Sequence, residues 1–311
     1  MKAIILDGPG PVENLVINDI ATPEIADQEV LVQVKSISIN PVDVKTRAGK
    51  GVYGRLKEIS PVIIGWDISG TVTESRSDLF KAGDEVFGMV NFPGHGKAYA
   101  EYVAAPADQL ALKPANITHE DAAAATLAAL TAFQALHHHA QIKAGQKVLI
   151  HAAAGGVGHY AVQLAKQAGA YVTGTSSAEN RDFVLSLGAD EHIDYKAVRF
   201  EEVLNDIDFV LDTIGGDNID RSIDVLKKNG TLISIPTGIP ESAAEKAKAN
   251  GVNASFTLVQ SSGEDMKQLA GLLEKGDLRS HVSKVFSFEE MGKAHLQVET
   301  GKTKGKVVVS L

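Results

Sequence analysis

The chain has 311 residues and a formal net charge of −9, with 44% hydrophobic residues, 22% charged residues and no cysteine. This length exceeds what one hydrophobic core usually serves, so two domains are expected. The acidic balance argues against nucleic acid or an anionic membrane as a partner, because both favour clustered Lys and Arg. No apolar run approaches the roughly 20 residues that span a bilayer, and disulfides and thiolate metal ligands are excluded. We expect a globular, cytoplasmic protein.

The first third of the chain has the pattern of short strands. Val30, Val32 and Val34 recur at every second position, which is the period of a half-buried strand. Short apolar runs follow at 68–72 and 85–90, separated by Gly, Asp and Pro clusters that favour turns. Many short strands with frequent turns are typical of a barrel-like or sandwich domain.

After about Asn116 the pattern changes to helices alternating with strands. Thr118 is a suitable N-cap for an alanine-rich helix that extends through Leu136. Short apolar strand candidates then alternate with helical stretches. The strand candidates are 148–150, 171–174, 209–211 and 231–235, and the helical stretches are 159–167, 180–187 and 218–226. This alternation predicts a doubly wound parallel sheet.

The C-terminal residues 306–311 are strand-like, and no helix follows them, so we expect them to pair back into the first domain. The fold class predicted is therefore α/β, with a Rossmann doubly wound parallel sheet inserted into a β-rich domain. The expected boundaries are 1–117 plus 283–311 for the discontinuous β-rich domain and 118–282 for the inserted domain.

A glycine-rich turn lies between the strand candidate 148–150 and the helix that follows it. Gly155 and Gly156, followed by Val157, let the backbone turn tightly and approach a pyrophosphate, and Gly158 lets the helix pack against its strand. The N–H groups at the start of the helix would face the phosphates. A turn without a ligand is the alternative. The strand, turn, helix and strand succession favours a bound dinucleotide.

The end of the next strand candidate indicates which dinucleotide binds. An acidic side chain about 20 residues after the loop commonly holds the ribose 2′-hydroxyl of NAD. Here the strand ends in Ser176 and Ser177, and Arg181 follows one turn later. Hydroxyl groups and a guanidinium suit a 2′-phosphate, so we predict NADP(H) as the cofactor. The alternative, compatible with this one, is that a serine caps the following helix.

Several segments spread over nearly the whole chain carry a family resemblance. They are 40–43, 65–70, 82–88, 98–102, 130–132, 152–158, 187–190 and 301–308. Their order and spacing resemble the zinc-independent medium-chain dehydrogenase/reductases of the quinone oxidoreductase type. In that family the N-terminal part and the C-terminal tail form a GroES-like catalytic domain around an inserted Rossmann domain. The resemblance implies the same organisation here.

Zinc-dependent relatives carry a cysteine near the start of the catalytic domain and a Gly-His-Glu where this chain has Gly65, Trp66 and Asp67. We therefore expect no metal ion. The run 137–139 consists of three histidines, but consecutive helical residues point in different directions and do not chelate one ion. Without a Lewis acid, alcohol oxidation lacks its usual means of stabilising an alkoxide.

The resemblance implies NADPH-dependent reduction of a small quinone or an α,β-unsaturated carbonyl compound, with hydride transferred to an electrophilic carbon. It places Asn40, Lys45 and Thr131 around the nicotinamide, with Asn40 and Thr131 as catalytic candidates. Tyr53 stands where enoyl reductases of this group have an acidic tyrosine, so it is a candidate to hold or protonate the substrate oxygen. A packing role for Tyr53 is the alternative.

Further cofactor contacts are implied along the Rossmann domain and the tail. Tyr195 would accompany the 2′-phosphate or the adenine. Many relatives have a lysine at the position of Asn180, so Asn180 is an alternative to Arg181 as the phosphate contact. The other cofactor-binding residues that the resemblance implies are Ile214, Phe256, Leu258, Gly305 and Lys306.

Three further hypotheses remain open from the sequence. Asp43 and Asp67 resemble a catalytic carboxylate pair, but a structural role is favoured, with Asp43 bonding the turn after Pro41 and Asp67 satisfying backbone donors. Many relatives dimerise by joining sheet edges, so a homodimer through 253–259 is expected. The alternative to an enzyme is an NADPH-binding redox sensor or structural protein with little turnover.

Overall fold

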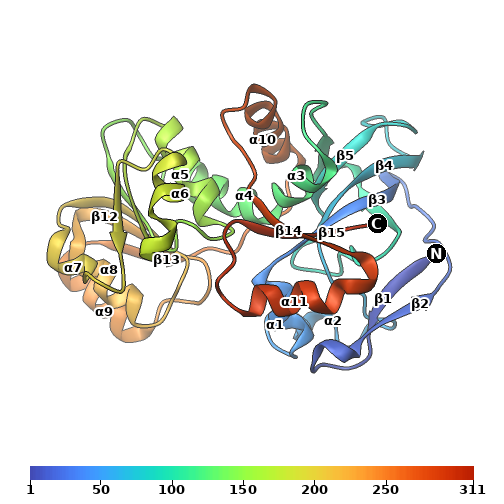
Figure 1. The fold of residues 1–311 in the computed structure, drawn as a ribbon, viewed down its shortest axis with the longest axis horizontal. Helices are drawn as coiled ribbons and strands as arrows, with labels where there is room; N and C mark the ends of the chain where they lie inside the picture. The colour runs from blue at the N-terminus through green and yellow to red at the C-terminus, as the bar shows by residue number, and fades with distance from the viewer. The chain divides into compact units, whose positions relative to one another are not determined.

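The computed structural model describes all residues, 1–311, and divides them into two compact units. One unit combines Met1–Leu130 with Gln260–Leu311, and the other is Thr131–Val259 (Figure 1). The first unit is therefore built from two stretches of sequence. The domain boundaries expected at 117/118 and 282/283 stay a prediction.

The first unit is built on a mixed seven-stranded sheet. Its strand order is β14-β15-β3-β4-β5-β7, and β6 pairs with β3. The strands are β3 (Glu29–Ile39), β4 (Asp67–Ser75), β5 (Glu85–Met89), β6 (Tyr102–Pro106), β7 (Leu110–Leu112), β14 (Val282–Ser287) and β15 (Lys306–Ser310). β1 (Lys2–Leu6) and β2 (Leu15–Asp19) form a separate antiparallel pair. The β-rich fold expected of this part is confirmed.

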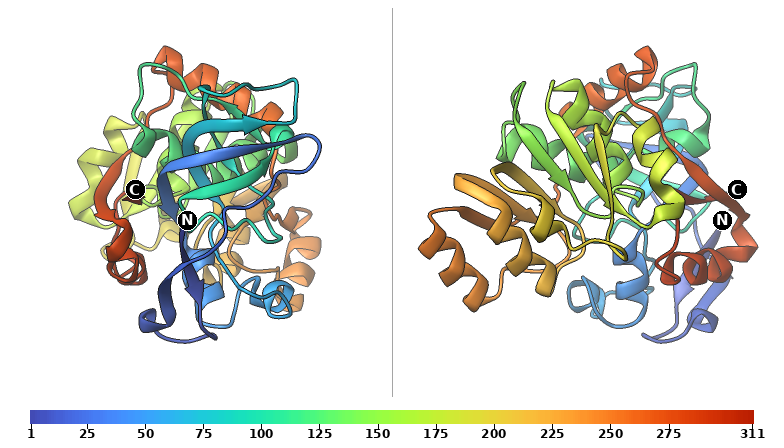
Figure 2. Two further views of the ribbon diagram at one scale, coloured as in Figure 1. Left: turned by 90° about the vertical axis from the view of Figure 1, so that its right-hand side faces the viewer. Right: turned by 60° about the vertical axis from the view of Figure 1, so that its left-hand side comes forward.

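The C-terminal strand returns to the first unit as expected. β15 pairs antiparallel with β3, so that Val308 lies opposite Ser38. Figure 2 shows β15, in red, beside the blue strands of the N-terminal part. This pairing brings Lys306, at the start of β15, to the end of β3, where helix α1 (Pro41–Arg47) begins.

The helix expected from Thr118 through Leu136 is interrupted, so that prediction was wrong in its continuity. Thr118 caps α3 (His119–Ala124) by accepting a hydrogen bond from the Asp121 N–H at 3.1 Å. A second helix, α4 (Leu127–Phe133), follows, and a π-helical turn covers Gln134–His139. The Leu127 N–H donates to the Asp67 carboxylate at 3.1 Å. A side chain distant in sequence thus takes an N–H group that a continuous helix would use itself.

The remaining helices of the first unit border its sheet. They are α2 (Tyr53–Leu56), α10 (Gly263–Lys275) and α11 (Met291–Glu299), with 3₁₀ turns at Val12–Asn14, Ala107–Gln109 and Phe288–Glu290. α10 packs along β7 at one edge of the sheet, and α11 contacts α1, β14 and β15. No helix of the protein combines the length and apolar character that a membrane span requires.

The second unit is a six-stranded parallel sheet with the order β10-β9-β8-β11-β12-β13. Its strands are β8 (Lys147–Ile150), β9 (Tyr171–Ser176), β10 (Glu191–Asp194), β11 (Ile207–Asp212), β12 (Leu226–Ser234) and β13 (Asn253–Phe256). The predicted doubly wound parallel sheet is confirmed. β10 was not among the expected strands, because only Ile193 among its residues is apolar.

Helices cover both faces of this parallel sheet (Figures 1 and 2). They are α5 (Gly158–Gln167), α6 (Arg181–Ser186), α7 (Phe200–Val203), α8 (Asp217–Val225) and α9 (Glu241–Asn250), with a 3₁₀ turn at Ala178–Asn180. The core between the sheet and α7, α8 and α9 includes Leu149, Val210 and Leu232. All parallel strands end at one edge, which is where the turns that follow β8, β9 and β11 gather.

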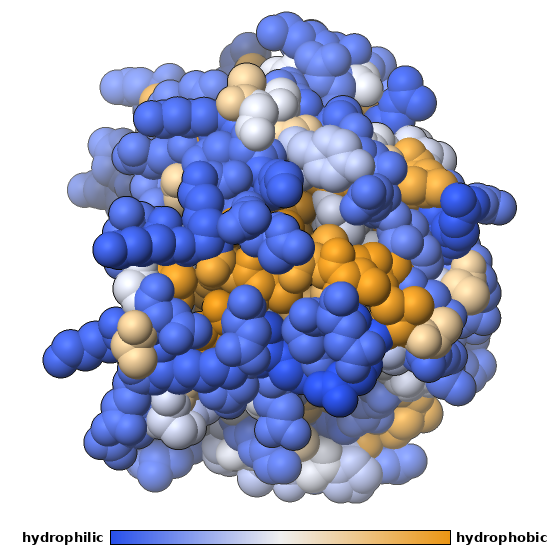
Figure 3. All heavy atoms as spheres, turned by 90° about the vertical axis from the view of Figure 1, so that its left-hand side faces the viewer, coloured by the Kyte–Doolittle hydropathy of each residue, from blue (hydrophilic) through white to orange (hydrophobic).

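The side of the second unit seen in Figure 3 carries a band of hydrophobic residues between hydrophilic ones. Large apolar side chains exposed in this unit include Val203, Ile214 and Phe256. β13 is the edge strand of the parallel sheet. Exposed apolar surface of this kind is typical of ligand or partner contacts.

Candidate functional site

The glycine turn joins β8 to α5 at the carboxyl edge of the parallel sheet. Ala152 has a φ of 46°, and the Gly155 N–H donates to the Ala152 carbonyl at 2.8 Å. A Cβ atom at Gly158 would lie 2.2 Å from the same carbonyl oxygen. Only glycine therefore fits at Gly158, where the helix must begin against the turn. This is the close approach that the sequence pattern predicts.

The turn leaves backbone donors at the start of α5. The N–H groups of Gly156 and Val157 donate to no acceptor within the protein, whereas the His159 N–H donates to the Gly155 carbonyl at 3.1 Å. α5 is a ten-residue helix, so its N-terminus carries a substantial partial positive charge. Free donors, positive potential and the absence of side-chain bulk together fit the pyrophosphate of a dinucleotide.

The end of β9 carries hydroxyl groups and a nearby cation, with no carboxylate in the strand's last residues. Ser176 and Ser177 are buried, and the Ser177 hydroxyl donates to the Glu179 carboxylate at 3.0 Å. The Asn180 amide donates to the Ser177 hydroxyl at 3.2 Å, so the serine also holds the 3₁₀ turn before α6. Arg181 is exposed and lies 3.5 Å from Asp182. The predicted residues Ser176, Ser177, Asn180 and Arg181 thus all lie between the end of β9 and the start of α6, and Asn180 is bonded to Ser177.

His192 is a neighbour of this cluster that the sequence did not suggest. It lies on β10 opposite Gly174, and its Nε2 is 2.8 Å from the Ser176 hydroxyl. Burial lowers the pKa of His192, and the positive charge of Arg181 lowers it further. Tyr195 follows β10, and its N–H donates to the Ser176 carbonyl at 3.3 Å while its side chain is 58% exposed. His192 lies on β10, a mostly polar strand that the sequence pattern did not predict, so nothing in the sequence pointed to this residue.

A third turn follows β11 and is organised by Asp212. Its carboxylate accepts hydrogen bonds from the N–H groups of Ile214 and Gly215, at 3.2 and 3.0 Å, and from the Ser234 hydroxyl at 3.1 Å. Ile214 is 53% exposed at this turn. Asp212 was missed from the sequence because a carboxylate after a buried strand has no distinctive spacing.

Phe256 ends the edge strand β13 opposite Ser234, at the same carboxyl edge, and is exposed. Leu258 follows two residues later and is half-buried. The predicted cofactor residues of the second unit therefore line the ends of successive strands of one sheet. Thr131 is buried on α4.

The first unit has a buried polar cluster around Asn40. The Asn40 amide donates to the Asp67 carboxylate at 2.7 Å, and its oxygen accepts from the Lys306 ammonium, which also donates to the Ile39 carbonyl at 3.3 Å. The Asn40 N–H donates to the Asp43 carboxylate at 2.7 Å. The structural roles expected of Asp43 and Asp67 are thus observed. The Asn40 amide also donates to the Ser38 carbonyl at 3.4 Å, so both of its N–H groups are bonded within the protein.

The pKa values in this cluster are shifted because two carboxyl groups, Asp43 and Asp67, are buried with one ammonium group, Lys306. Burial and the neighbouring Asp67 raise the pKa of Asp43 to about 7. Burial also raises the pKa of Asp67, against the opposing effects of Lys306 and of hydrogen bonds from Asn40 and Leu127. The pKa of Lys306 is lowered by burial. Burial therefore favours the protonated form of both carboxyl groups more than water would, and Asp43 changes its charge near neutral pH.

The other predicted residues of the first unit lie outside this hydrogen-bonded cluster. Lys45 is exposed on α1, and Tyr53 is half-buried at the start of α2, with no hydrogen bond from its hydroxyl. Gly305 has a φ of 64°, and a Cβ there would lie 2.1 Å from the His281 carbonyl oxygen. Gly305 is thus required by the backbone that leads into Lys306. No group of three or more His, Cys, Asp or Glu side chains is arranged to hold a metal ion.

Comparisons with known proteins match this architecture along its length. The family described as "Alcohol dehydrogenase GroES-like domain" matches residues 26–115, and that described as "Zinc-binding dehydrogenase" matches residues 187–309. The mitochondrial NAD(P)H oxidoreductase RTN4IP1 of Homo sapiens is 33% identical over 91% of this chain and 82% of its own length. The chain belongs to the medium-chain dehydrogenase/reductase superfamily, in its quinone oxidoreductase type.

Two further members of this superfamily illustrate the type. The chloroplastic NADPH-dependent alkenal/one oxidoreductase of Arabidopsis thaliana is 33% identical, over 99% of this chain and 79% of its own length. The solved quinone oxidoreductase of Coxiella burnetii superposes with a TM-score of 0.94 and 40% identity, over 100% of this chain and 99% of that one. The chain described here is thus an NAD(P)H-dependent oxidoreductase, like these relatives.

Proposed function

We propose that this chain uses NADPH, without zinc, to reduce quinones or α,β-unsaturated carbonyl compounds. The observation that carries the cofactor choice is the end of β9, where Ser176 and Ser177 stand with Arg181 nearby and the strand ends in no carboxylate. A 2′-phosphate favours hydroxyl donors and a guanidinium. A 2′-hydroxyl favours the carboxylate that this strand end lacks.

The chain's own residues supply the binding groups for such a cofactor. The N–H groups of Gly156 and Val157 would hold the pyrophosphate, and Ser177 with Arg181 the 2′-phosphate. Tyr195 would lie against the adenine or the phosphate. Ile214, Phe256 and Leu258 offer apolar surface along the same edge of the sheet. Asn40, Lys45, Thr131, Gly305 and Lys306 are proposed for the nicotinamide end.

Bound NADPH supplies a hydride for an electrophilic carbon. In an enone that hydride would go to the β-carbon, so that negative charge would develop on the carbonyl oxygen and a proton would be needed to complete the saturated product. We propose that Tyr53 holds or protonates the substrate oxygen, or that solvent completes the protonation. Asn40 is held by four hydrogen bonds, so its amide oxygen has a fixed position from which it could contact a ligand. Positioning then supplies most of the rate acceleration.

Two names among the relatives support the substrate class. The Arabidopsis relative is named for alkenals and enones, and the Coxiella structure for quinones. A homodimer through 253–259 is also proposed, since β13 is an edge strand that a second copy could extend. The cytoplasmic location stays a prediction, and relatives named mitochondrial and chloroplastic mark other compartments in the family.

The proposal is tested by following NADPH oxidation at 340 nm with a panel of benzoquinones, enones and 2-alkenals, with and without EDTA. We expect turnover of at least one acceptor class, a clear preference for NADPH over NADH and no effect of the chelator. Tight NADPH binding without oxidation by any acceptor would instead favour a redox sensor. Loss of activity in EDTA would contradict the zinc-independent reaction.

A further inference from the structure

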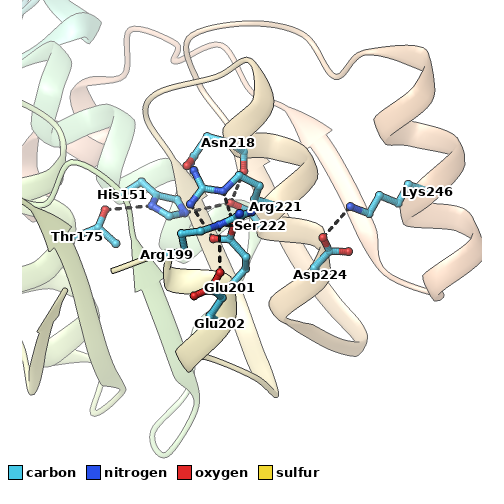
Figure 4. Close-up of polar contacts among 10 residues, drawn as sticks. All are labelled: His151, Thr175, Arg199, Glu201, Glu202, Asn218, Arg221, Ser222, Asp224 and Lys246. Carbon is cyan, nitrogen blue, oxygen red and sulfur yellow. Dashed lines mark hydrogen bonds and ion pairs between the residues drawn. The ribbon is translucent and has the colours of Figure 1, made fainter. Parts of the chain in front are cut away.

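His151 is a buried histidine that the proposed chemistry does not use. It follows β8 directly and precedes Ala152, the first residue of the glycine turn. Its side chain is bonded on both sides. Nδ1 lies 3.0 Å from the Thr175 hydroxyl of β9, and Nε2 lies 3.0 Å from the Ser222 hydroxyl of α8 (Figure 4).

The direction of these two hydrogen bonds follows from the bond that the Ser222 hydroxyl makes in turn. The Ser222 hydroxyl donates to the Asn218 carbonyl at 2.6 Å, so its oxygen must accept from His151. Nε2 of His151 therefore carries the proton, and Nδ1 accepts from the Thr175 hydroxyl. The imidazole is neutral and confined to one tautomer, in agreement with burial lowering the pKa of His151 to about 4.

The same residue is anchored by its backbone. The His151 N–H donates to the Leu211 carbonyl at 3.1 Å, and the His151 carbonyl accepts from the Thr213 hydroxyl at 2.8 Å. The Asn218 amide donates to the Asp212 carboxylate at 2.9 Å. Asp212 in turn holds the N–H groups of the turn after β11. One connected series of hydrogen bonds therefore links the turns that follow β8 and β11 to the end of β9.

The series is sealed from solvent by an ion-paired cover. The ring of Phe200 lies 4.7 Å from the imidazole, and the Arg221 guanidinium lies over Phe200 at 4.6 Å. Glu201 binds Arg221 through two hydrogen bonds, at 2.8 and 2.6 Å, and also pairs with Arg199 at 2.7 Å (Figure 4). The charged groups that act on His151 are Asp212, Arg221 and Glu201. Because water is excluded, breaking one of these buried hydrogen bonds would leave a donor or an acceptor without a partner, which costs free energy.

We propose that His151 is a positioning residue for the dinucleotide, fixing the turns after β8 and β11 in the geometry that the phosphates require. This inference rests on the proposed NADPH-binding function. An apolar side chain of similar size would fill the same space, but it would orient neither Thr175 nor Ser222. Because Ala152 already has a strained φ of 46°, the residue before it must be held firmly.

The test compares the variants His151→Phe, Thr175→Val and Ser222→Ala with a control, Ile207→Ala. Ile207 is a buried core residue at the start of β11, the amino end of the strands, so its truncation destabilises the unit without touching the series. Thermal unfolding and NADPH fluorescence titrations are measured for all variants, at a temperature where each is folded. Steady-state kinetics then separate KM from kcat.

We expect His151→Phe to weaken NADPH binding about 10-fold, and Thr175→Val and Ser222→Ala about 3-fold each. The KM for NADPH should rise while kcat at saturating NADPH changes by less than about 2-fold. Ile207→Ala should lower the melting temperature but leave NADPH binding unchanged. The inference is overturned if His151→Phe binds NADPH as tightly as Ile207→Ala. Failure of the wild-type chain to bind NADPH would overturn the proposed function instead.

Discussion

Arg181 is the residue through which cofactor choice is most simply tested. Its guanidinium is exposed one helical turn after Ser176 and Ser177, its charge acts on His192, and its one ion pair, to Asp182, is long at 3.5 Å. An exposed pair of this kind contributes little to stability, so the arginine is available to a ligand. Its positive charge would stabilise the 2′-phosphate of NADPH, a group that NADH lacks.

We expect Arg181→Ala to weaken NADPH binding about 10-fold and NADH binding by less than about 2-fold. Fluorescence titration with both cofactors measures the two affinities. Lys248→Ala, on the exposed face of α9, removes the same charge elsewhere and should change neither. Equal weakening of both cofactors by Arg181→Ala would show that the guanidinium does not recognise the 2′-phosphate.

Tyr53 is the side chain proposed, beside solvent, as the source of the proton, and its hydroxyl makes no hydrogen bond within the protein. We expect Tyr53→Phe to lower kcat for an enone by at least about 10-fold, since a positioned general acid contributes that much or more. NADPH affinity should not change. The kcat and KM of the variant are compared with those of wild type over one enone series. Unchanged turnover would assign the proton to solvent.

Asp43 links the buried cluster to pH. Its folded pKa of about 7 lies above the ordinary value of 3.8, so its protonated form favours the folded state. The stability that it contributes is full below about pH 3.8 and is lost as the pH rises through about 7. Asp43→Asn removes this titration. From pH 5 to 8 we expect wild type to lose stability relative to Asp43→Asn, by up to about 1.4 kcal/mol per pH unit.

Urea unfolding of both proteins at each pH gives this difference. The conservative amide keeps an oxygen that can accept from the Asn40 N–H, so the comparison isolates the charge. A difference in stability that stays constant across the range would mean that Asp43 remains ionised throughout.

At the scale of elements, the turn from β8 into α5 places backbone donors where a phosphate can reach them. Its geometry depends on Gly158, because the start of α5 lies directly against the Ala152 carbonyl. A methyl group there must push the helix away from the turn. The cost falls on folding and on cofactor binding together, because the same backbone serves both.

We expect Gly158→Ala to destabilise the protein by about 2 kcal/mol and to weaken NADPH binding. Gly271→Ala is the matched control, since Gly271 lies within α10 with open space where the methyl group would go. That change should stabilise the helix slightly. Calorimetry of both variants measures whether the melting temperature falls for Gly158→Ala and rises slightly for Gly271→Ala. A Gly158→Ala variant as stable as wild type would contradict the close contact between Gly158 and the Ala152 carbonyl.

For the whole molecule, local pattern predicted much of the architecture. Period-two Val residues predicted β3, the strand and helix alternation predicted the parallel sheet, and the apolar tail predicted β15. The break after Ala124 could not be predicted, because it depends on Asp67, a carboxylate about 60 residues earlier in the chain. β10 was hidden by its polar composition.

The residues of the candidate site also fall into those that local sequence could predict and those that it could not. Ser176, Ser177 and Arg181 lie close in sequence, so local reasoning grouped them. His192, Asp212 and Ser222 act through neighbours on other strands and helices, and no spacing along the chain reveals such contacts. Asn40 was expected near the nicotinamide, and the structure adds that Lys306 and Asp67 hold its side chain.

The proposed function requires that hydride from NADPH reach the β-carbon of an activated double bond. The most direct measurement uses NADPH deuterated at nicotinamide C4, with each face labelled in turn, and an α,β-unsaturated ketone as acceptor. Mass spectrometry and NMR locate the label in the product. The proposed function predicts a saturated ketone with deuterium at the β-carbon from one labelled face. Deuterium at the carbonyl carbon, in an allylic alcohol, would contradict it.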